Sequence, residues 1–148
     1  PTLILQTTKS MKVMQEEIFG PLLPVLTYRN VQEALDYINA HGTATERGDI
    51  AESTATYQVF GEHTAISSLK SYLGHTLGAC GAIESWASIM MMKDQWFAPT
   101  LNLTERDPAC AALNYICGEA RTMQCDYVMN NNFAFGGVNT SLIFRRWA

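Results

Sequence analysis

Two short segments, each containing one histidine, carry the residue types in this chain that are best suited to chemistry. His41 lies in Asn-Ala-His-Gly-Thr-Ala-Thr at residues 39–45, and His75 ends Lys-Ser-Tyr-Leu-Gly-His at residues 70–75. A neutral imidazole can donate a hydrogen bond from one ring nitrogen while a partner holds the other. Two such donors aimed at one carbonyl oxygen would stabilise the negative charge that develops on it.

A third segment, at residues 132–139, reads Asn-Phe-Ala-Phe-Gly-Gly-Val-Asn and places two aromatic residues beside a glycine pair. Residues 126–133 and 139–146 are predicted strands on either side, so Gly136 and Gly137 predict the turn that joins them. Glycine also lets a backbone pass close to a ligand, because it has no Cβ. The segment is therefore a candidate for a binding loop as well as for a turn.

The order and spacing of these segments resemble the C-terminal half of a β-ketoacyl-acyl-carrier-protein synthase, and the resemblance runs from about Leu35 to the C-terminus. It implies an α/β chain with part of a thiolase-like fold, a mixed sheet flanked by helices. It also implies an enzyme that condenses an acyl thioester with malonyl-carrier protein by decarboxylation, in fatty acid or polyketide biosynthesis. Further matching segments lie at residues 48–49, 68–71, 74–79 and 98–103.

The resemblance also assigns roles to individual residues. His41 and His75 would donate hydrogen bonds to the carbonyl oxygen of the malonyl thioester and stabilise the enolate that decarboxylation produces. Lys70 would order the hydrogen bonds of the active site, and Glu84 would be a structural acid. Phe135 would be an aromatic gate whose backbone N–H contributes to an oxyanion hole. The residues that would contact the pantetheine arm or line the acyl pocket are Thr43, Thr45, Phe133, Phe135, Gly136 and Gly137.

The nucleophile of this family is a cysteine on a sharp strand-to-helix turn, and the resemblance places it in the half of the fold that precedes these segments. None of the four cysteines, Cys80, Cys110, Cys117 and Cys125, has that setting. We therefore expect the chain by itself to be inactive in condensation. The cysteines form no Cys-x-x-Cys pair, so no structural zinc is predicted, and the resemblance implies no cofactor.

A different resemblance covers the start of the chain. Residues 11–28, with Gln-Glu-Glu-Ile-Phe-Gly-Pro at their centre, look like a fragment of the aldehyde dehydrogenase superfamily. That likeness puts Glu17 at a position that binds the nicotinamide ribose and Phe19 beside the nicotinamide. No Gly-rich dinucleotide loop, catalytic cysteine or general base is recognisable with them, so both residues are interpreted as relics. We expect an aldehyde-dehydrogenase-like fragment at 1–38 and a synthase domain at 39–148.

Two other functions stay open at this point. One is that of a non-catalytic module that binds carrier protein or pairs with a synthase. The other is that of a dehydrogenase remnant with a residual NAD contact. Binding of carrier protein without turnover would favour the first of these, and a titration with NAD would test the second.

The composition indicates a globular chain, with 47% hydrophobic and 16% charged residues. The net charge of −4 argues against nucleic acid as the main partner. No apolar run approaches the ~20 residues that span a bilayer, and the start has no basic segment typical of a signal peptide. We expect a cytoplasmic protein whose partner is an acyl carrier protein with a phosphopantetheine-linked group. A homo-oligomer or a missing synthase half would be a further partner.

The predicted elements alternate along the chain. Residues 2–6 and 22–28 are β-prone, residues 49–60 predict a helix that stops at Gly61, and residues 65–68 predict a short strand. Residues 75–93 predict the longest helix, buried on most sides.

Residues 35–39 are contested between two structures. Apolar residues from Val31 to Ile38 recur at helical spacing, and Asn30 can cap such a helix. The synthase resemblance requires a strand that leads into His41. We predict strand from about Asp36, because pairing within a sheet buries more surface than one short helix does.

Overall fold

The computed structural model describes residues 2–4, 11–12, 22–24 and 35–147. It forms two compact units, Pro1–Glu33 and Ala34–Ala148. In the first unit, β1 (Thr2–Ile4) pairs in parallel with β2 (Leu22–Pro24), with Thr2 opposite Leu22. Both strands fall within the segments that the sequence marks as β-prone, so the β-rich appendage is confirmed. Glu17 and Phe19 lie outside the described residues.

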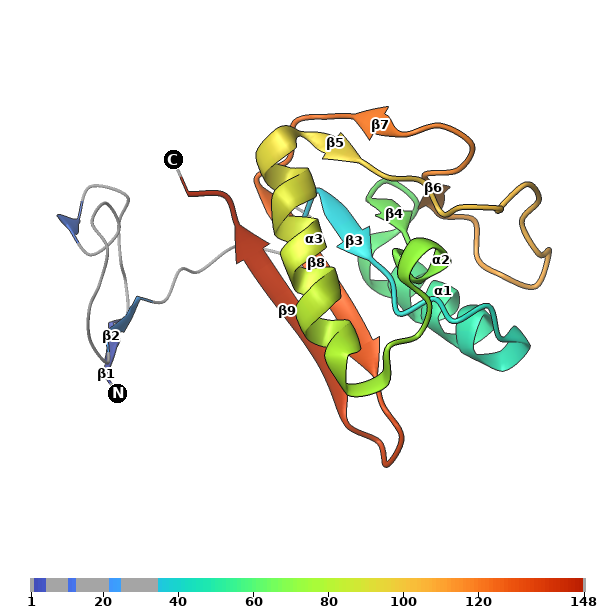
Figure 1. Ribbon diagram of the computed structural model, residues 1–148, viewed down its shortest axis with the longest axis horizontal. Helices are drawn as coiled ribbons and strands as arrows, with labels where there is room; N and C mark the ends of the chain where they lie inside the picture. Colours follow the sequence, from blue (N-terminus) through green and yellow to red (C-terminus); the bar gives the residue numbers. More distant parts are fainter. Residues whose placement is uncertain (1, 5–10, 13–21, 25–34, 148) are drawn as a thin grey trace. The chain divides into compact units, whose positions relative to one another are not determined.

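The second unit is built on a mixed five-stranded sheet with the order β6-β4-β3-β8-β9 (Figure 1). The four strands from β6 to β8 pair in parallel, and β9 runs antiparallel to β8, with Val128 opposite Phe144. Parallel neighbours need long crossover connections, which the helices between them supply. The strands are β3 (Tyr37–Asn39), β4 (Ala65–Ser67), β6 (Asn114–Tyr115), β8 (Tyr127–Phe133) and β9 (Asn139–Arg145).

The helices of this unit are α1 (Glu46–Phe60), α2 (Lys70–Leu73), the 3₁₀ turn η3 (Leu77–Ala79) and α3 (Cys80–Asp94). A second pair of short strands, β5 (Trp96–Phe97) and β7 (Arg121–Thr122), is antiparallel. Figure 1 shows α3 lying along β8, with the β8–β9 hairpin extending beyond its end. Within the described part of the chain, no helix combines the length and the apolar character that crossing a bilayer requires.

The strand predicted at the contested segment is confirmed. Residues Tyr37–Asn39 form β3, which lies between β4 and β8, and all three side chains are fully buried. A central strand recovers hydrogen bonds on both edges as well as burial, and this outweighs the helical periodicity of an isolated short segment.

The long helix predicted at 75–93 begins later and is less buried than expected. It starts at Cys80, because Gly74 (φ +70°) and Leu77 (φ +52°) have left-handed backbone conformations that a right-handed helix does not contain. Its buried face carries Glu84 and Ser88, whereas Trp86 on another face is 65% exposed. The prediction of burial on most sides is therefore wrong.

The core lies between the sheet, α3 and the β5 segment. The rings of Tyr37 and Phe97 pack with their centroids 4.6 Å apart. The Tyr37 hydroxyl donates to Ser67 Oγ at 2.7 Å, and Ser67 Oγ donates to the carbonyl oxygen of Ala98 at 2.8 Å. These bonds fix β3 to β4 and to the segment after β5. They therefore hold in place the carboxyl ends of β3 and β4, which precede the loops that carry the two histidines. The remaining buried members of this cluster are Ala65, Leu69, Met91, Met92, Ala98, Ile116, Cys125 and Val128.

Candidate active site

His41 lies two residues after the end of β3, and a buried carboxylate holds its loop in place. Glu52 of α1 accepts the backbone N–H of His41 and that of Gly42, each at 2.9 Å. Burial raises the pKa of Glu52, although these two N–H groups act in the opposite direction. The carboxylate replaces the hydrogen bonds that a turning backbone would otherwise leave unmade.

Sequence reasoning missed Glu52. The signal was present, because residues 52, 56 and 60 share one face of α1 and are all buried. An acid on such a stripe must find hydrogen-bond donors within the fold. Its donors turn out to be the backbone of the loop that carries His41.

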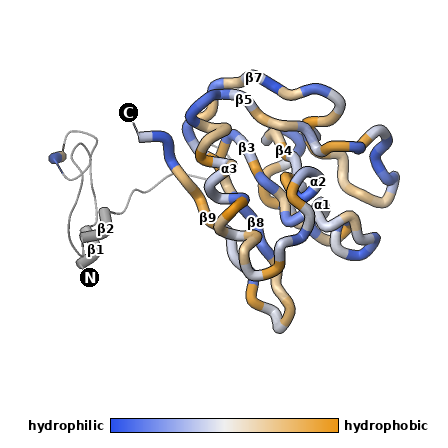
Figure 2. The backbone as a smooth tube through the Cα atoms, in the orientation of Figure 1, coloured by the Kyte–Doolittle hydropathy of each residue, from blue (hydrophilic) through white to orange (hydrophobic). Residues whose placement is uncertain are grey.

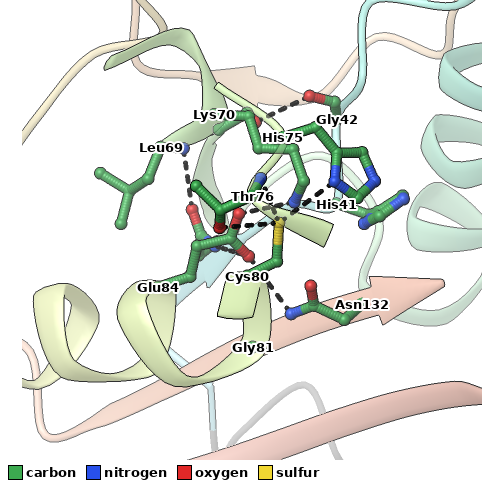
Figure 3. Close-up of polar contacts among 12 residues, drawn as sticks. His41, Gly42, Leu69, Lys70, His75, Thr76, Cys80, Gly81, Glu84 and Asn132 are labelled. Atoms are coloured by element: carbon green, nitrogen blue, oxygen red, sulfur yellow. Dashed lines mark hydrogen bonds and ion pairs between the residues drawn. The ribbon is translucent and has the colours of Figure 1, made fainter. Parts of the chain in front are cut away.

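The two histidines lie together. The ring centroids of His41 and His75 are 5.4 Å apart and the rings are perpendicular. Figure 3 shows the two side chains next to each other. Phe133, the last residue of β8, also packs against His41, with its centroid 5.4 Å from that of the imidazole. Three separate loops and strand ends therefore converge on one point, at the carboxyl end of the parallel strands.

A buried ion pair lies beneath the histidines. Lys70 Nζ donates to Glu84 Oε1 at 2.6 Å, and their side chains are 4% and 1% exposed. Oε2 of Glu84 accepts the side-chain amides of Asn132 at 3.2 Å and Asn39 at 3.5 Å. The network joins α2, α3, β3 and β8 at one place (Figure 3).

The other predicted site residues are not all gathered here. Thr43 is half-buried and Thr45 is exposed, with their hydroxyl oxygens 3.0 Å apart, in the loop after His41. Phe135 is 94% exposed in the turn between β8 and β9, so it packs against no acyl pocket within the described residues. Figure 2 shows apolar residues continuing into this hairpin. Gly136 (φ +85°) and Gly137 (φ +81°) form the predicted turn, which requires the left-handed region.

A cavity of about 610 Å³ opens beside the second histidine. Its lining includes Thr43, Lys70 and His75 as well as Thr100 and Arg106. It therefore offers hydroxyl groups and cations next to the histidine that could meet a thioester. Within the described residues, no group of three or more His, Cys, Asp and Glu side chains could hold a metal ion.

His41 is held in its neutral form. The pKa of His41 is lowered to about 4, mainly by partial burial, and the charges of Lys70 and His75 act in the same direction. Its Nδ1 is buried and has no hydrogen-bond partner among the described residues. A neutral ring can still donate from one nitrogen, which is the state that polarising a carbonyl requires.

We predict that the ring of His41 titrates with a midpoint near pH 4 in an NMR pH series. The folded pKa lies below the ordinary value of 6.5, so the unfolded chain binds this proton first as the pH falls. The His41 contribution to stability should thus be complete above pH ~6.5 and be lost between pH ~6.5 and ~4. His75→Gln removes one of the repelling charges and should raise the midpoint. A midpoint at the ordinary histidine value in the unsubstituted chain would contradict the prediction.

His75 is held by a strained backbone. The N–H of Leu77 donates to His75 Nδ1 at 3.1 Å, and Leu77 reaches it from the left-handed region at φ +52°. Such a conformation in a bulky residue costs of the order of 1–3 kcal/mol. The Leu77 side chain is 68% exposed, so its own burial does not offset that cost. The strained backbone of Leu77 places its N–H against the imidazole. It is also the reason that the helix begins only at Cys80.

Gly42 lies where a side chain does not fit. Its φ is +37°, and a Cβ placed there would lie 2.7 Å from both Cβ and Oγ of Ser68, whose hydroxyl donates to the Gly42 carbonyl. Gly61 offers a matched comparison, because its φ is +66° and a Cβ there would meet nothing within 4 Å.

Gly61→Ala should therefore lower the free energy of unfolding by about 1 kcal/mol, from backbone strain alone. Gly42→Ala should cost about 1–2 kcal/mol more, because the clash with Ser68 adds to the strain. Urea denaturation of the two variants measures the difference. Equal losses would mean that the loop after β3 can shift to admit a methyl group.

The comparisons with known proteins agree on one family. The chain matches the family described as Beta-ketoacyl synthase, C-terminal domain, over residues 5–104. The 3-oxoacyl-[acyl-carrier-protein] synthase 2 of Coxiella burnetii is 45% identical over 117 residues, which are 77% of this chain and 28% of the relative. The corresponding synthase 1 of Escherichia coli is 38% identical over 122 residues, 82% of this chain and 30% of the relative. The chain thus spans less than a third of the length of these relatives.

Solved structures carry the same fold. A β-ketoacyl synthase from Burkholderia phymatum has 70% sequence identity and a TM-score of 0.76, over 78% of this chain and 28% of that one. A ketosynthase in complex with its type II polyketide acyl-carrier protein has 34% identity and a TM-score of 0.72, over 77% and 28%. The thiolase-like α/β fold expected from the sequence is therefore confirmed. This chain belongs to the β-ketoacyl synthase family and carries residues of its C-terminal domain.

Proposed function

We propose that these residues form the thioester-polarising part of a β-ketoacyl-acyl-carrier-protein synthase active site. In this role His41 and His75 donate hydrogen bonds to the carbonyl oxygen of a malonyl thioester. The carbon–carbon bond to the carboxylate then breaks, CO₂ leaves, and the electron pair becomes an enolate whose oxygen faces the two donors. The enolate carbon attacks the carbonyl carbon of an acyl thioester, the carbon–sulfur bond of that thioester breaks, the thiolate leaves, and the acyl chain is longer by two carbons.

The observation that carries the proposal is the perpendicular packing of the two imidazoles, with centroids 5.4 Å apart. Two rings at that separation can both reach one oxygen with N–H donors of ordinary length. The low pKa of His41 keeps its ring neutral at physiological pH. Lys70 lies close enough to lower that pKa, and so acts on the site electrostatically, while Glu84 holds it.

The proposed partner is an acyl carrier protein that delivers malonyl and acyl groups on phosphopantetheine. Thr43, half-buried, and Thr45, exposed, support this, because their hydroxyls lie in the loop beside His41 and can bond a pantetheine amide. One structural relative is a ketosynthase in complex with its acyl-carrier protein. Phe133 and the turn at Gly136 and Gly137 are proposed to border the acyl group. For Phe135, the role of a gate requires a surface that packs on its exposed ring.

The proposal is tested by the release of CO₂ from malonyl-carrier protein. The unsubstituted chain should release it faster than the His41→Ala and His75→Ala variants do. Release that is indifferent to both substitutions would remove the basis of the proposal.

The 148-residue chain by itself should not condense an acyl thioester with malonyl-carrier protein. Burial raises the pKa of Cys125 to about 12, which leaves its thiol protonated. Neither Cys110 nor Cys117 stands on a strand-to-helix turn. Without a thiolate on such a turn, no covalent acyl intermediate forms. Radiolabelled acyl transfer followed by product analysis measures this, and an elongated product that disappears in His75→Ala would prove the prediction wrong.

The start of the chain keeps a separate interpretation. We propose that residues 1–38 derive from an aldehyde dehydrogenase, on the support of the Gln15–Pro21 motif alone. Glu17 and Phe19 are then relics of a nicotinamide site. A titration with NAD should show no saturable binding.

A further inference from the structure

We propose that Cys80 is a positioning residue for His75, and that its thiol fixes the imidazole in the tautomer with hydrogen on Nε2. The inference rests on the proposed function in one respect: the Nε2–H is taken to be the donor to the thioester. The assignment of the tautomer itself stands on the contacts around the two side chains.

Cys80 is the first residue of α3, and its sulfur lies among three polar neighbours. Sγ is 3.3 Å from Nδ1 of His75. It also accepts from Thr76, whose backbone N lies at 3.1 Å and whose Oγ1 lies at 3.4 Å. Figure 3 shows these contacts converging on the sulfur from the turn that carries His75. Cys80 is 3% exposed, so bulk water does not compete for them.

The direction of each hydrogen bond follows from the backbone N–H of Leu77, which can act only as a donor. This N–H points at Nδ1 of His75 at 3.1 Å. Nδ1 must therefore present a lone pair, and the neutral ring carries its hydrogen on Nε2. Since Nδ1 has no hydrogen to offer, the hydrogen between Nδ1 and Sγ belongs to the thiol.

The S–H bond of Cys80 is oriented by the hydrogen bonds that the sulfur accepts. Two donors from Thr76 reach the sulfur lone pairs, so the remaining direction for the S–H bond is toward Nδ1. Leu77 and Cys80 thus donate to the imidazole, and Thr76 donates to the sulfur of Cys80. His75 is an exposed residue, so its Nε2–H can meet a ligand.

The opposite interpretation is that His75 activates Cys80 as a nucleophile. A thiol must then pass its proton to Nδ1, and that new N–H would face the Leu77 N–H at 3.1 Å. Leu77 cannot easily turn away, because its left-handed backbone is fixed between His75 and α3. The burial of the sulfur also keeps an incoming carbonyl from it. The contacts therefore favour a thiol that donates its hydrogen bond to His75 over an imidazole that deprotonates Cys80.

The tautomer is measured directly by long-range ¹H–¹⁵N correlation of the labelled chain without substrate, at about pH 8, above the ordinary range of histidine pKa values. The unsubstituted chain should show Nε2–H as the dominant tautomer of the His75 ring. Cys80→Ala removes one of the two donors to Nδ1, and the ratio of Nε2–H to Nδ1–H should fall by about three- to tenfold. Cys80→Ser keeps a donor and should restore part of the ratio. Cys117→Ala, at an exposed thiol away from the ring, should leave it unchanged.

Three results would overturn the proposal. The first is a dominant Nδ1–H tautomer in the unsubstituted chain, which is measured without any variant. The second is a tautomer ratio that Cys80→Ala leaves unchanged. The third is an acyl adduct on Cys80, found by mass spectrometry after incubation with acetyl-pantetheine, because it would make the thiol a nucleophile. Neither readout uses CO₂ release, so the tautomer proposal and the proposed function can fail separately.

Discussion

Replacing Glu84 by glutamine should lower the free energy of unfolding by about 3–5 kcal/mol, which is the cost of breaking a buried ion pair from one side. The carboxylate is 1% exposed and accepts from the Lys70 ammonium at 2.6 Å. A glutamine keeps the shape but removes the charge, and so leaves a buried cation without its partner. The loss is a large fraction of the about 5–15 kcal/mol by which a domain of this size is stable.

Urea denaturation followed by circular dichroism measures the loss. The matched control is the exposed pair of Asp126 and Arg146, with side chains 49% and 44% exposed and a closest contact of 2.9 Å. Asp126→Asn should cost no more than about 1 kcal/mol, because water screens that pair. A Glu84→Gln loss as small as the control would mean that water reaches Lys70.

A double-mutant cycle separates the pair from the rest of the network. Lys70→Met together with Glu84→Gln removes both charges, so the double variant should be more stable than the sum of the two single losses predicts. Its remaining loss reports on Asn39 and Asn132, whose amides still face the site. Simple additivity would show that the two charges do not interact, despite their contact.

The sequence predicts the parts of this site that depend on chain order and on local pattern. β8 and β9 form where the sequence predicts two strands joined by a glycine pair. β3 forms at a segment with helical periodicity, because a central position in the sheet was available to it. The histidine motifs were recognisable one by one. The resemblance supplied what their spacing alone does not, namely that His41 and His75 meet.

The remaining features depend on tertiary contacts that leave no local pattern. The late start of α3 follows from a strained Leu77, and nothing about a leucine predicts a left-handed backbone. Cys80 was placed inside a helix, and it lies against His75 only because that helix begins with it. Glu52 pairs with backbone groups, which have no residue signature in a sequence.

Loss of one imidazole donor should reduce CO₂ release from malonyl-carrier protein by about 10²–10³-fold, the range seen when a single oxyanion donor is removed. His75→Ala is the sharper case, because its Nδ1 is held by Leu77 and Cys80 and its ring is already oriented before substrate arrives. His41→Ala should cost a similar factor, since its ring is neutral at the assay pH and 5.4 Å from that of His75.

The third histidine provides the control for these two. His63 is exposed, and its backbone carbonyl accepts the Asn114 side-chain amide at 2.9 Å. His63→Ala should therefore leave CO₂ release unchanged.

The double variant His41→Ala with His75→Ala decides whether the two rings act together. If both donate to one developing oxyanion, the second removal acts on a transition state that has already lost its stabilisation, and the combined loss should fall well short of the product of the single losses. Losses that multiply in full would mean that the rings act on separate steps. In that case the centroid distance of 5.4 Å would reflect packing of two loops and not a shared substrate oxygen.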